Sequence, residues 1–551
     1  MSRSRWNIAA RLMKLVKPLA GWMAVSVTAG TLGHLCATFI MIFAAWAVLD
    51  GLGRSVPFSA GFLYAWMILF AAIRAVLKYT EQGCNHYIAF RLLALIRDHV
   101  FKALRRLSPA KLEARNKGDL ISLITSDIEL LEVFYAHTIS PVCIALIYTI
   151  IMLVFIASIH PLLGVLALFS WAAAGIALPV LTSHFAADTG ERVRKSSAQL
   201  STAVLDSLRG LSETIRYDDG ERRMAYMEEK TDLLLEAQEE EKYIAGRNMA
   251  TASLLISIFD VMMIICGIAL YQRGAVKFDG VLVSSIAMMS SFGPVTALAA
   301  LGSTLQNTFA AAGRVLDILD EAPVTEDITG KEPAVCGEIN AEDVSFSYEE
   351  EEILRNLSMR IQEHRITGIT GRSGSGKSTF LKLLMRFWQP QKGTIEIAGR
   401  NINTINTSEL RNMESYLTQD TFLFSDSIRN NLKIAKPDAT DEEIETACRK
   451  ASVHEWIMSL PLGYDTPAGE LGDRLSEGEK QRIGLARAFL HDAPVILLDE
   501  PASNLDSLNE GIILKSLREE AAGKTVVLIS HRPSSIRIAD DTFTVENGRL
   551  S

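Results

Sequence analysis

Six long apolar stretches fill the first 311 residues of this 551-residue chain, and they constrain its fold more than any other feature. A bilayer core about 30 Å thick needs roughly 20 apolar residues per helix. The stretches that meet this length run over 19–49, 57–82, 134–159, 161–183, 246–272 and 280–311. We therefore predict a six-helix membrane domain over residues 1–320.

The rest of the chain has the composition of a soluble protein. An acidic stretch with two prolines, "EAPVTEDITGKEPAVC" at 321–336, separates the two parts and predicts a flexible linker. Residues 337–551 then form a second, soluble domain.

Basic residues predict the orientation of the helices, because Lys and Arg gather on the cytoplasmic side of a membrane. They precede the first stretch and follow the second, at Arg3, Arg5, Arg11, Lys14, Lys17, Arg97, Lys102, Arg105, Arg106 and Lys111, whereas loop 50–56 has only Arg54. We expect both termini in the cytoplasm and the protein in the cytoplasmic (inner) membrane. Two long polar segments, between the second and third and between the fourth and fifth stretches, should extend as helices on that side.

Charge and cysteine usage exclude other classes. The net charge of −9 argues against a nucleic-acid binder, which would carry a basic patch. The six cysteines show no CxxC and no metal-binding spacing, which predicts free thiols.

The stretch "GRSGSGKS", Gly371–Ser378, fits the phosphate-loop pattern G-x-x-x-x-G-K-[ST]. It follows a β-prone run and precedes a helical one, which is the context that this motif requires. Its backbone N–H groups would surround phosphate oxygens, Lys377 would reach the β- and γ-phosphates, and Ser378 would hold Mg²⁺.

A second acidic motif, "PVILLDEP", follows later in the chain. Its apolar run predicts a buried parallel strand, and Asp499 at the strand end is placed to hold Mg²⁺. Glu500 is a candidate to polarise the water that attacks the nucleotide.

Seven motifs in this order resemble the nucleotide-binding domain of ABC transporters. They are Tyr348 in "FSY", Gly371–Thr379, Gln419 in "YLTQD", "LSEGEKQR", "ILLDEP", Asp506 in "SNLD" and His531 in "ISHRP". Six preceding helices with long cytoplasmic extensions resemble a half-transporter of the exporter fold. The fold class implied is a six-helix α-helical membrane domain followed by an α/β P-loop ATPase.

The resemblance implies a role for each matching residue. ATP would be bound by the loop residues Gly371, Arg372, Ser373, Gly374, Ser375, Gly376, Lys377, Ser378 and Thr379. Tyr348 would stack on adenine, Gln419 would sense Mg²⁺, Glu500 would be the general base and His531 the γ-phosphate switch. Asp506 would shape the contact between two ATPase domains, which sandwich two ATP molecules in this family.

The signature, Ser476, Glu477, Gly478 and Glu479, would act on the ATP of a partner half-transporter. It departs from the family pattern Leu-Ser-Gly-Gly-Gln at two positions. Ser476 and Glu479 fit a capping box, which explains Glu479 as part of a helix start. Glu477 replaces a glycine that should approach a γ-phosphate, and we predict that Glu477→Gly raises turnover at the partner's site.

Charged residues inside the apolar stretches are candidates for a transport pathway. Asp260 lies about 14 residues into the fifth stretch, roughly 20 Å deep at about 1.5 Å per residue; it either handles substrate or a cation, or bonds a neighbouring helix. Arg74 and Lys78 either attract an anion or extend to the headgroups. His34 and His137 either line a cavity, where they could hold a metal or haem, or pack in the interior.

We conclude that the sequence predicts an ATP-driven transporter subunit that moves a small molecule across the lipid bilayer and pairs with a second, different half-transporter. "SPAKLEARNKGDL" and "LRGLSETIRYDDGE" are candidate coupling elements. Within the family, "SNLDSLNEGIIL" and "SAQLSTAVLDSLRGLSETIRY" look most similar to heterodimeric exporters of cysteine or glutathione. Multidrug or lipid exporters and exporter-fold siderophore importers are alternatives, as is an ATP-gated receptor or channel. A soluble ABC ATPase conflicts with the apolar stretches.

Overall fold

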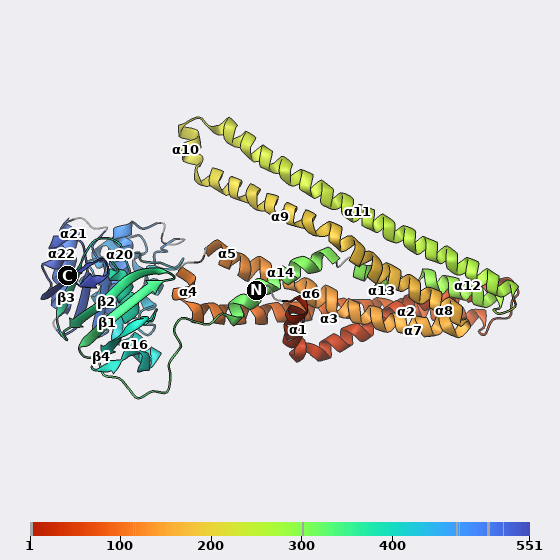
Figure 1. The fold of residues 1–551 in the computed structure, drawn as a ribbon, viewed down its shortest axis with the longest axis horizontal. Helices are drawn as coiled ribbons and strands as arrows, with labels where there is room; N and C mark the ends of the chain where they lie inside the picture. The colour runs from red at the N-terminus through yellow and green to blue at the C-terminus, as the bar shows by residue number, and fades with distance from the viewer. Residues whose placement is uncertain are drawn as a thin grey trace. The chain divides into compact units, whose positions relative to one another are not determined.

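The computed structural model describes residues 4–113, 115, 117–299, 302–469, 472, 474–503, 507–521 and 523–550. The chain divides into two compact units (Figure 1). The first comprises Met1–Ala103 and Arg115–Glu321, and the second comprises Leu104–Ala114 and Ala322–Ser551.

Apart from the end of α3 and the short helix α4, the helices before residue 321 belong to the first unit. They are α1 (Arg5–Val16), α2 (Ala20–Gly51), α3 (Ala60–Leu107), α4 (Ala110–Glu113), α5 (Lys117–Ser122), α6 (Ile128–Phe134), α7 (Ser140–Ile159), α8 (Pro161–Ala172), α9 (Leu178–Arg209), α10 (Leu211–Arg216), α11 (Gly220–Gln272), α12 (Phe278–Met289), α13 (Gly293–Ala299) and α14 (Gly302–Asp320). Short helical turns of other kinds join several of them: η1 (Lys17–Leu19), η2 (Leu123–Asp127), η3 (Tyr135–Ile139) and η4 (Ala173–Ala177).

Among the described residues, five helices are long and apolar enough to cross a membrane. They lie within Trp6–Gly51, Ala60–Leu107, Gly118–Ile159, Gly220–Gln272 and Phe278–Leu298. These five overlap five of the six predicted stretches. The remaining stretch contains a shorter apolar helix, Pro161–Ala177, so the structure supports five candidate crossings and leaves the sixth as a prediction.

The interior of this unit is apolar, with some of its polar groups paired across helices. Ile42, Met152 and Met263 from three different helices are fully buried in one cluster. The Tyr148 and Thr38 hydroxyls lie 2.5 Å apart. Such pairing is needed because a buried polar group without a partner is costly in an apolar environment.

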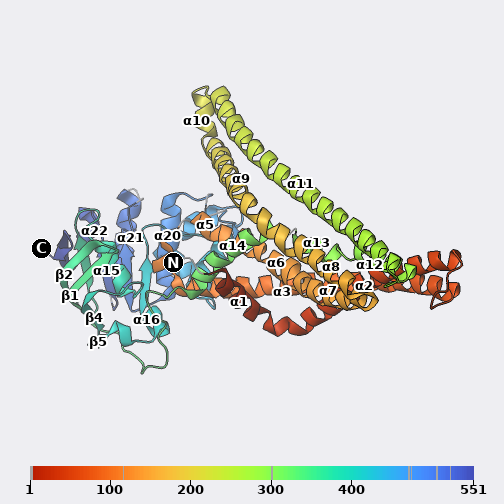
Figure 2. The same ribbon diagram turned by 45° about the vertical axis from the view of Figure 1, so that its right-hand side comes forward.

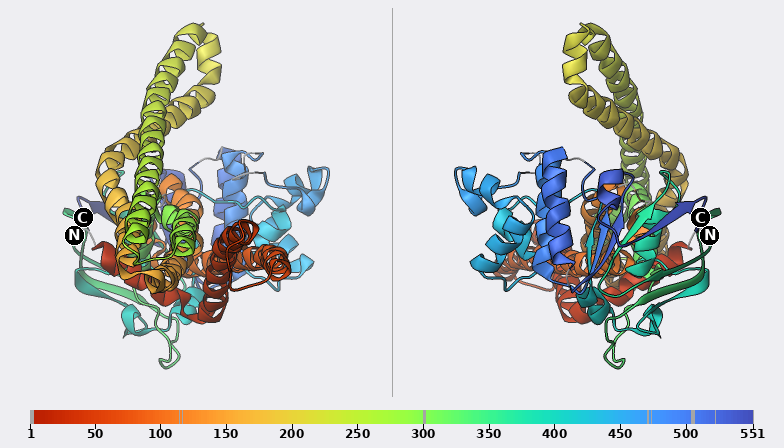
Figure 3. Two further views of the ribbon diagram at one scale, coloured as in Figure 1. Left: turned by 90° about the vertical axis from the view of Figure 1, so that its right-hand side faces the viewer. Right: turned by 90° about the vertical axis from the view of Figure 1, so that its left-hand side faces the viewer.

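Helices α9 and α11 run side by side as a long hairpin, with α10 at its far end (Figures 2 and 3). The hairpin corresponds to the predicted polar extension between the fourth and fifth stretches. Leu211 and Ile215 on α10 and the adjacent Tyr217 are exposed.

The second unit contains two sheets. An antiparallel sheet has the order β2-β1-β4-β5, and a mainly parallel sheet has the order β10-β9-β3-β8-β7-β6. The strands are β1 (Ile339–Tyr348), β2 (Glu351–Ile361), β3 (Ile366–Thr370), β4 (Lys392–Ile397), β5 (Arg400–Asn401), β6 (Glu414–Leu417), β7 (Val495–Asp499), β8 (Thr525–Ile529), β9 (Asp541–Glu546) and β10 (Arg549–Leu550).

Helices surround these sheets. They are α15 (Lys377–Leu384), α16 (Thr407–Met413), α17 (Ile428–Lys433), α18 (Asp441–Lys450), α19 (His454–Ser459), α20 (Glu477–His491), α21 (Ser507–Glu520) and α22 (Pro533–Ile536), with 3-10 turns η5 (Ile402–Thr404) and η6 (Gly463–Asp465). β7 and β8 pair in parallel and every residue in both is buried, as expected of central strands covered on both faces. All six cysteines are free, as predicted.

The segment predicted as a flexible linker is bound to the second unit. The backbone N–H of Ile328 donates to Thr407 Oγ1 at 2.9 Å, and that of Lys331 donates to Asn406 Oδ1 at 2.8 Å. Arg400 also donates to the carbonyl of Glu332 at 2.8 Å. Composition alone suggested flexibility, but polar side chains around α16 satisfy the backbone of this segment.

Candidate functional site

The phosphate-loop motif forms the predicted strand, loop and helix. β3 leads into the loop, and α15 begins at Lys377. Gly371 and Gly376 have φ angles of +144° and +98°, which favour glycine. A Cβ at Gly371 would also lie 2.2 Å from the Val545 carbonyl oxygen, so no other residue fits there without displacing the backbone.

Lys377 is held by the loop itself. Its Nζ donates to the carbonyls of Gly371 and Arg372 at 3.0 and 2.8 Å. Burial lowers the pKa of this ammonium group, while Glu500 and Asp499 act in the opposite direction. A phosphate oxygen bound in the loop would replace these two neutral carbonyls as the acceptor of Lys377 Nζ, and a charged acceptor makes the stronger hydrogen bond.

Ser378 and Asp499 meet at the edge of the sheet. Ser378 Oγ donates to Asp499 Oδ1 at 3.0 Å. Asp499 is the buried last residue of β7, and burial raises its pKa despite this hydrogen bond. A hydroxyl and a carboxylate this close, with Gln419 lining the same cavity, form an oxygen donor set that fits Mg²⁺.

Glu500 follows directly and lies beside His531. Glu500 Oε1 is 3.2 Å from His531 Nδ1. Its φ of +53° is unusual for a residue with a side chain and costs about 1 to 3 kcal/mol. Two hydrogen bonds hold this backbone: Glu500 N–H donates to the Ile529 carbonyl at 3.0 Å, and Gln481 Nε2 donates to the Glu500 carbonyl at 2.8 Å.

Gln481 is a positioning residue that the sequence analysis missed. It lies on α20 and also donates to Ser503 Oγ at 3.2 Å. The only signal was its place in "EKQR", five residues after Ser476. No local pattern relates that position to Glu500.

A cavity of about 590 Å³ joins Lys377, Ser378, Glu500 and His531, and its volume suits a nucleotide. It is lined by Ile353, Gly371, Arg372, Ser373, Gly374, Gly376, Lys377, Ser378, Thr379, Gln419, Glu500 and His531. Ser375 is buried in the loop and its hydroxyl has no hydrogen-bond partner among the described residues. Tyr348 packs edge-on against Trp388 with ring centroids 5.1 Å apart, and Ile353 is the β2 residue at the cavity, so adenine stacking by Tyr348 remains a prediction.

The signature residues lie at the start of α20, and the predicted capping box is confirmed. Ser476 N–H donates to Glu479 Oε2 at 2.8 Å, and Glu479 N–H donates to Ser476 Oγ at 3.4 Å. The Glu477 carboxylate turns to Lys480, with Oε1 2.8 Å from Nζ. None of the described residues lining the cavity comes from this helix. Asp506 lies outside the described residues.

The predicted pathway residues belong to the first compact unit. Asp260 is on α11, and its Oδ1 is buried with no hydrogen-bond partner in the described part of the chain. Arg74 is an exposed residue of α3. Lys78, His34 and His137 line one cavity of the membrane-domain unit. No cluster of three or more His, Cys, Asp or Glu that could hold a metal occurs among the residues described.

The first predicted coupling element, "SPAKLEARNKGDL", contains α4. Residues Leu104–Ala114 belong to the same compact unit as the sheets. Glu113 Oε2 lies 3.0 Å from Nζ of Lys382 on α15, the helix that follows the phosphate loop. An ion pair thus joins α4 to the helix that follows the phosphate loop.

The membrane helices and the phosphate-loop site together define the class of protein, a membrane-bound P-loop ATPase. A family model described as "ABC transporter" matches residues 354–503, and one described as "ABC transporter transmembrane region" matches residues 23–295. A "Probable ABC transporter ATP-binding/permease protein" of Haemophilus influenzae is 44% identical over 555 residues, covering 100% of both chains. The "ATP-dependent lipid A-core flippase" of Syntrophus aciditrophicus is 30% identical over 565 residues, covering 99% of this chain and 91% of the relative.

A solved structure shares the fold. It is titled "Structure of a bacterial Atm1-family ABC exporter with ATP bound", and the likeness has a TM-score of 0.84 at 22% identity over 97% of this chain and 94% of that chain. The chain belongs to the ABC transporter family. It is a multi-pass membrane protein with a fused ABC ATPase domain, and its ATPase activity is coupled to transport.

Proposed function

We propose that this chain is one half of a heterodimeric exporter that moves a small molecule across the cytoplasmic membrane by alternating access. The observation that carries the proposal is the joining of Lys377, Ser378, Glu500 and His531 in one nucleotide-sized cavity. Helix Pro161–Ala177 would be the sixth crossing, and both termini would be cytoplasmic, as the basic residues indicate. The boundaries 1–320, 321–336 and 337–551 remain our proposed division of the chain.

The described residues suggest how ATP would be cleaved. Loop N–H groups and Lys377 would bind the phosphates, and Mg²⁺ held by Ser378, Asp499 and Gln419 would offset their negative charge. Glu500 would accept the proton of the attacking water, and His531 would donate a hydrogen bond towards the γ-phosphate. The reaction of ATP with water would yield ADP and phosphate.

The dimer is proposed because none of the described residues that line the cavity belongs to the chain's own signature. A second half-transporter would bring its signature to Lys377, while Ser476–Glu479 would act on the partner's ATP. The sequence resemblance favours thiol exporters such as those for cysteine or glutathione. The names of the relatives support multidrug or lipid export as the alternative.

Uptake into inside-out membrane vesicles tests the proposal. Vesicles that contain wild type or Glu500→Gln would be compared for their uptake of radiolabelled cysteine, radiolabelled glutathione and a fluorescent lipid. We expect ATP-dependent accumulation of one of these, and a loss of about 100-fold or more in ATP turnover in the variant, because general-base catalysis contributes about 10²- to 10⁴-fold. Movement that is equal without ATP would contradict a pump and support a channel.

A further inference from the structure

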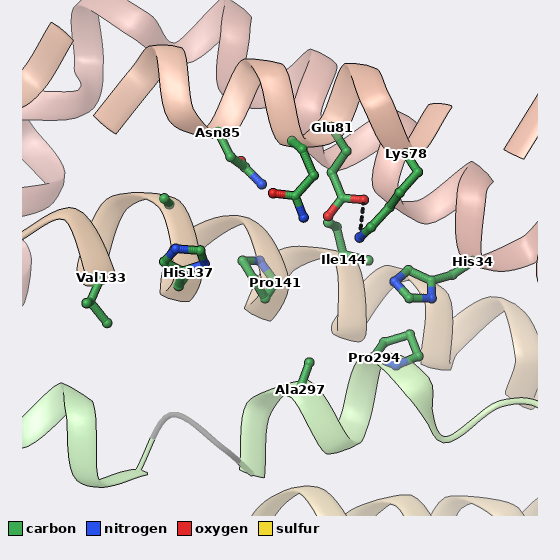
Figure 4. Close-up of a pocket in the computed structure, with 12 residues that line it drawn as sticks. His34, Lys78, Glu81, Asn85, Val133, His137, Pro141, Ile144, Pro294 and Ala297 are labelled. Carbon is green, nitrogen blue, oxygen red and sulfur yellow. Dashed lines mark hydrogen bonds and ion pairs between the residues drawn. The ribbon is translucent and has the colours of Figure 1, made fainter. Parts of the chain in front are cut away.

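A cavity of about 510 Å³, with an apolar lining interrupted by several polar side chains, lies inside the membrane-domain unit (Figure 4). One wall is α3, which contributes Lys78, Glu81 and Asn85. Pro141 and Ile144 of α7 and Pro294 of α13 form apolar walls. Figure 4 shows the three α3 side chains pointing towards the other helices.

The polar residues of α3 share one face of the helix. Positions 78, 81 and 85 follow the i, i+3/i+4 spacing of neighbours on a helical surface. Polar and charged groups within a membrane helix are costly unless they face the protein interior or a water-filled cavity. Their position on the cavity wall meets that condition, and it argues against a role for Lys78 in reaching the headgroups.

The charge available to a ligand in this cavity is positive. Glu81 is 5% exposed, and its Oε2 lies 2.9 Å from Lys78 Nζ. The Lys78 side chain is 52% exposed. An ammonium group has three donors, and the pair with Glu81 uses one, so the others are accessible from the cavity.

A neutral donor lies two turns along the same helix. Asn85 Oδ1 accepts from Ser26 Oγ at 2.6 Å, and that hydroxyl lies 3.0 Å from Ser140 Oγ. This network anchors the amide at its oxygen. No described residue accepts a hydrogen bond from Asn85 Nδ2, which leaves both its hydrogens for a ligand.

We propose that this cavity binds an amphiphilic organic anion, with its acidic group on Lys78 and Asn85 and its apolar body against Pro141, Ile144 and Pro294. The proposal rests on the proposed transport function and names the class of its substrate. Glu81 competes with the ligand for Lys78, so it lowers the affinity for the anion. It also neutralises the charge of Lys78 when no ligand is bound. The anion is either a water-soluble solute or the head group of an anionic lipid.

Equilibrium binding to the full-length protein in phosphatidylcholine nanodiscs, without ATP, tests the site. The probes are dansylglycine, an anion, and dansylamide, which is uncharged. We expect wild type to bind dansylglycine at least about tenfold more tightly, and Lys78→Gln to lose that tenfold preference, about 1.4 kcal/mol. Glu81→Gln should bind the anion several-fold more tightly, because Lys78 loses its internal partner. Lys102→Gln, on the same helix but paired with exposed Asp98, is the matched control and should bind as wild type does.

A purely structural ion pair gives a different pattern. If Lys78→Gln and Glu81→Gln weaken binding alike, or if dansylamide binds as well as dansylglycine, the proposal is overturned. The double variant Lys78→Gln with Glu81→Gln leaves no unpaired buried charge, so it should retain its melting temperature and still lack the anion preference. A double variant that binds the anion as wild type does also overturns the proposal.

Two further arms complete the test. Phosphatidylglycerol added to the nanodiscs displaces the probe from wild type if the anion is a lipid, and leaves it bound if the anion is a soluble solute. Glu500→Gln should bind dansylglycine normally, because no ATP is involved. Failure of ATP-driven uptake with intact probe binding counts against the proposed function alone, and ATP-driven uptake without anion preference counts against this inference alone.

Discussion

Glu414, the first residue of β6, is a buried carboxyl group in the ATPase unit. Neither of its oxygens has a hydrogen-bond partner among the described residues, and Arg411 Nη1 is 4.0 Å away. Burial raises the pKa of Glu414 to about 8, with Arg411 and Arg386 opposing the shift. The unfolded chain therefore releases this proton first as the pH rises, and the folded state loses stability as the pH climbs from about 4.5 to about 8.

We predict that Glu414→Gln removes this loss. Between about pH 5 and about pH 8, the variant's free energy of unfolding should fall by about 3 kcal/mol less than that of wild type, because Gln does not ionise. Thermal unfolding of the purified protein at both pH values measures the difference. Glu442→Gln, at an exposed position of α18, is the control, and a variant that tracks wild type at both pH values would contradict the prediction.

Glu477 has a partner that the sequence analysis did not consider. Lys480 lies one turn further along α20, and its side chain is 15% exposed while that of Glu477 is 61% exposed. The pair offsets the negative charge that the signature would bring to the partner's phosphate. We now expect Glu477→Gly to raise ATP turnover by only about twofold, since partly exposed ion pairs contribute up to about 1 kcal/mol.

Lys480→Gln should have the larger effect. It leaves Glu477 unpaired beside the partner's nucleotide, so turnover should fall about fivefold at subsaturating ATP, which corresponds to about 1 kcal/mol. The double variant, Lys480→Gln with Glu477→Gln, should recover most of the lost ATP turnover. Steady-state ATPase assays of the assembled transporter measure the turnover of Glu477→Gly, Lys480→Gln and the double variant. Unchanged turnover in Lys480→Gln would mean that Glu477 does not approach the phosphate.

At the scale of elements, α4 is joined to α15 by the ion pair of Glu113 and Lys382. Because α15 begins at the phosphate-loop lysine, we predict that this pair couples ATP turnover to transport. Glu113→Lys should lower the amount transported per ATP by about fivefold, the lower end of typical coupling energies, with basal ATPase within about twofold. The charge swap of Glu113→Lys with Lys382→Glu should recover coupling.

The measurement is substrate uptake divided by phosphate release in the same vesicles. Asp98→Asn, which removes an exposed carboxylate of α3, is the control. Equal loss of uptake and ATPase activity in Glu113→Lys would indicate a folding defect and contradict a specific coupling role.

Elements with a local pattern were predictable from the sequence. The phosphate loop between strand and helix, the buried strand before Asp499 and the capping box at Ser476 each depend on residues close together in the chain. The Glu113–Lys382 pair joins residues 269 apart, and no local spacing encodes it. The hydrogen bonds of the 321–336 segment were not predictable for the same reason, because Thr407 and Asn406 lie 79 and 75 residues downstream of the N–H groups that they accept from.

At the scale of the whole molecule, the chain has the features of a half-transporter. Its cavity is lined by the phosphate loop and by Glu500, the proposed general base, and no described residue of its own signature is in that lining. α10 leaves Ile215 72% exposed at the end of the α9–α11 hairpin. Leu211 and Tyr217 are exposed as well, and several exposed apolar side chains close together in the chain suit contact with a partner subunit.

We predict that this contact helps to hold the proposed heterodimer together. Two differently tagged copies expressed alone should not co-purify, whereas the product of a neighbouring half-transporter gene should co-purify with either. Ile215→Asp should reduce recovery of that partner by at least about tenfold, because a buried charge facing an apolar surface costs more than about 1.4 kcal/mol. Ser212→Asp places the same charge at an already polar position of α10 and should leave recovery unchanged. Efficient co-purification of the two tagged copies would contradict the heterodimer. Each ATP site of the resulting homodimer would then face a signature that contains Glu477. Lys480→Gln would in that case lower turnover at both sites.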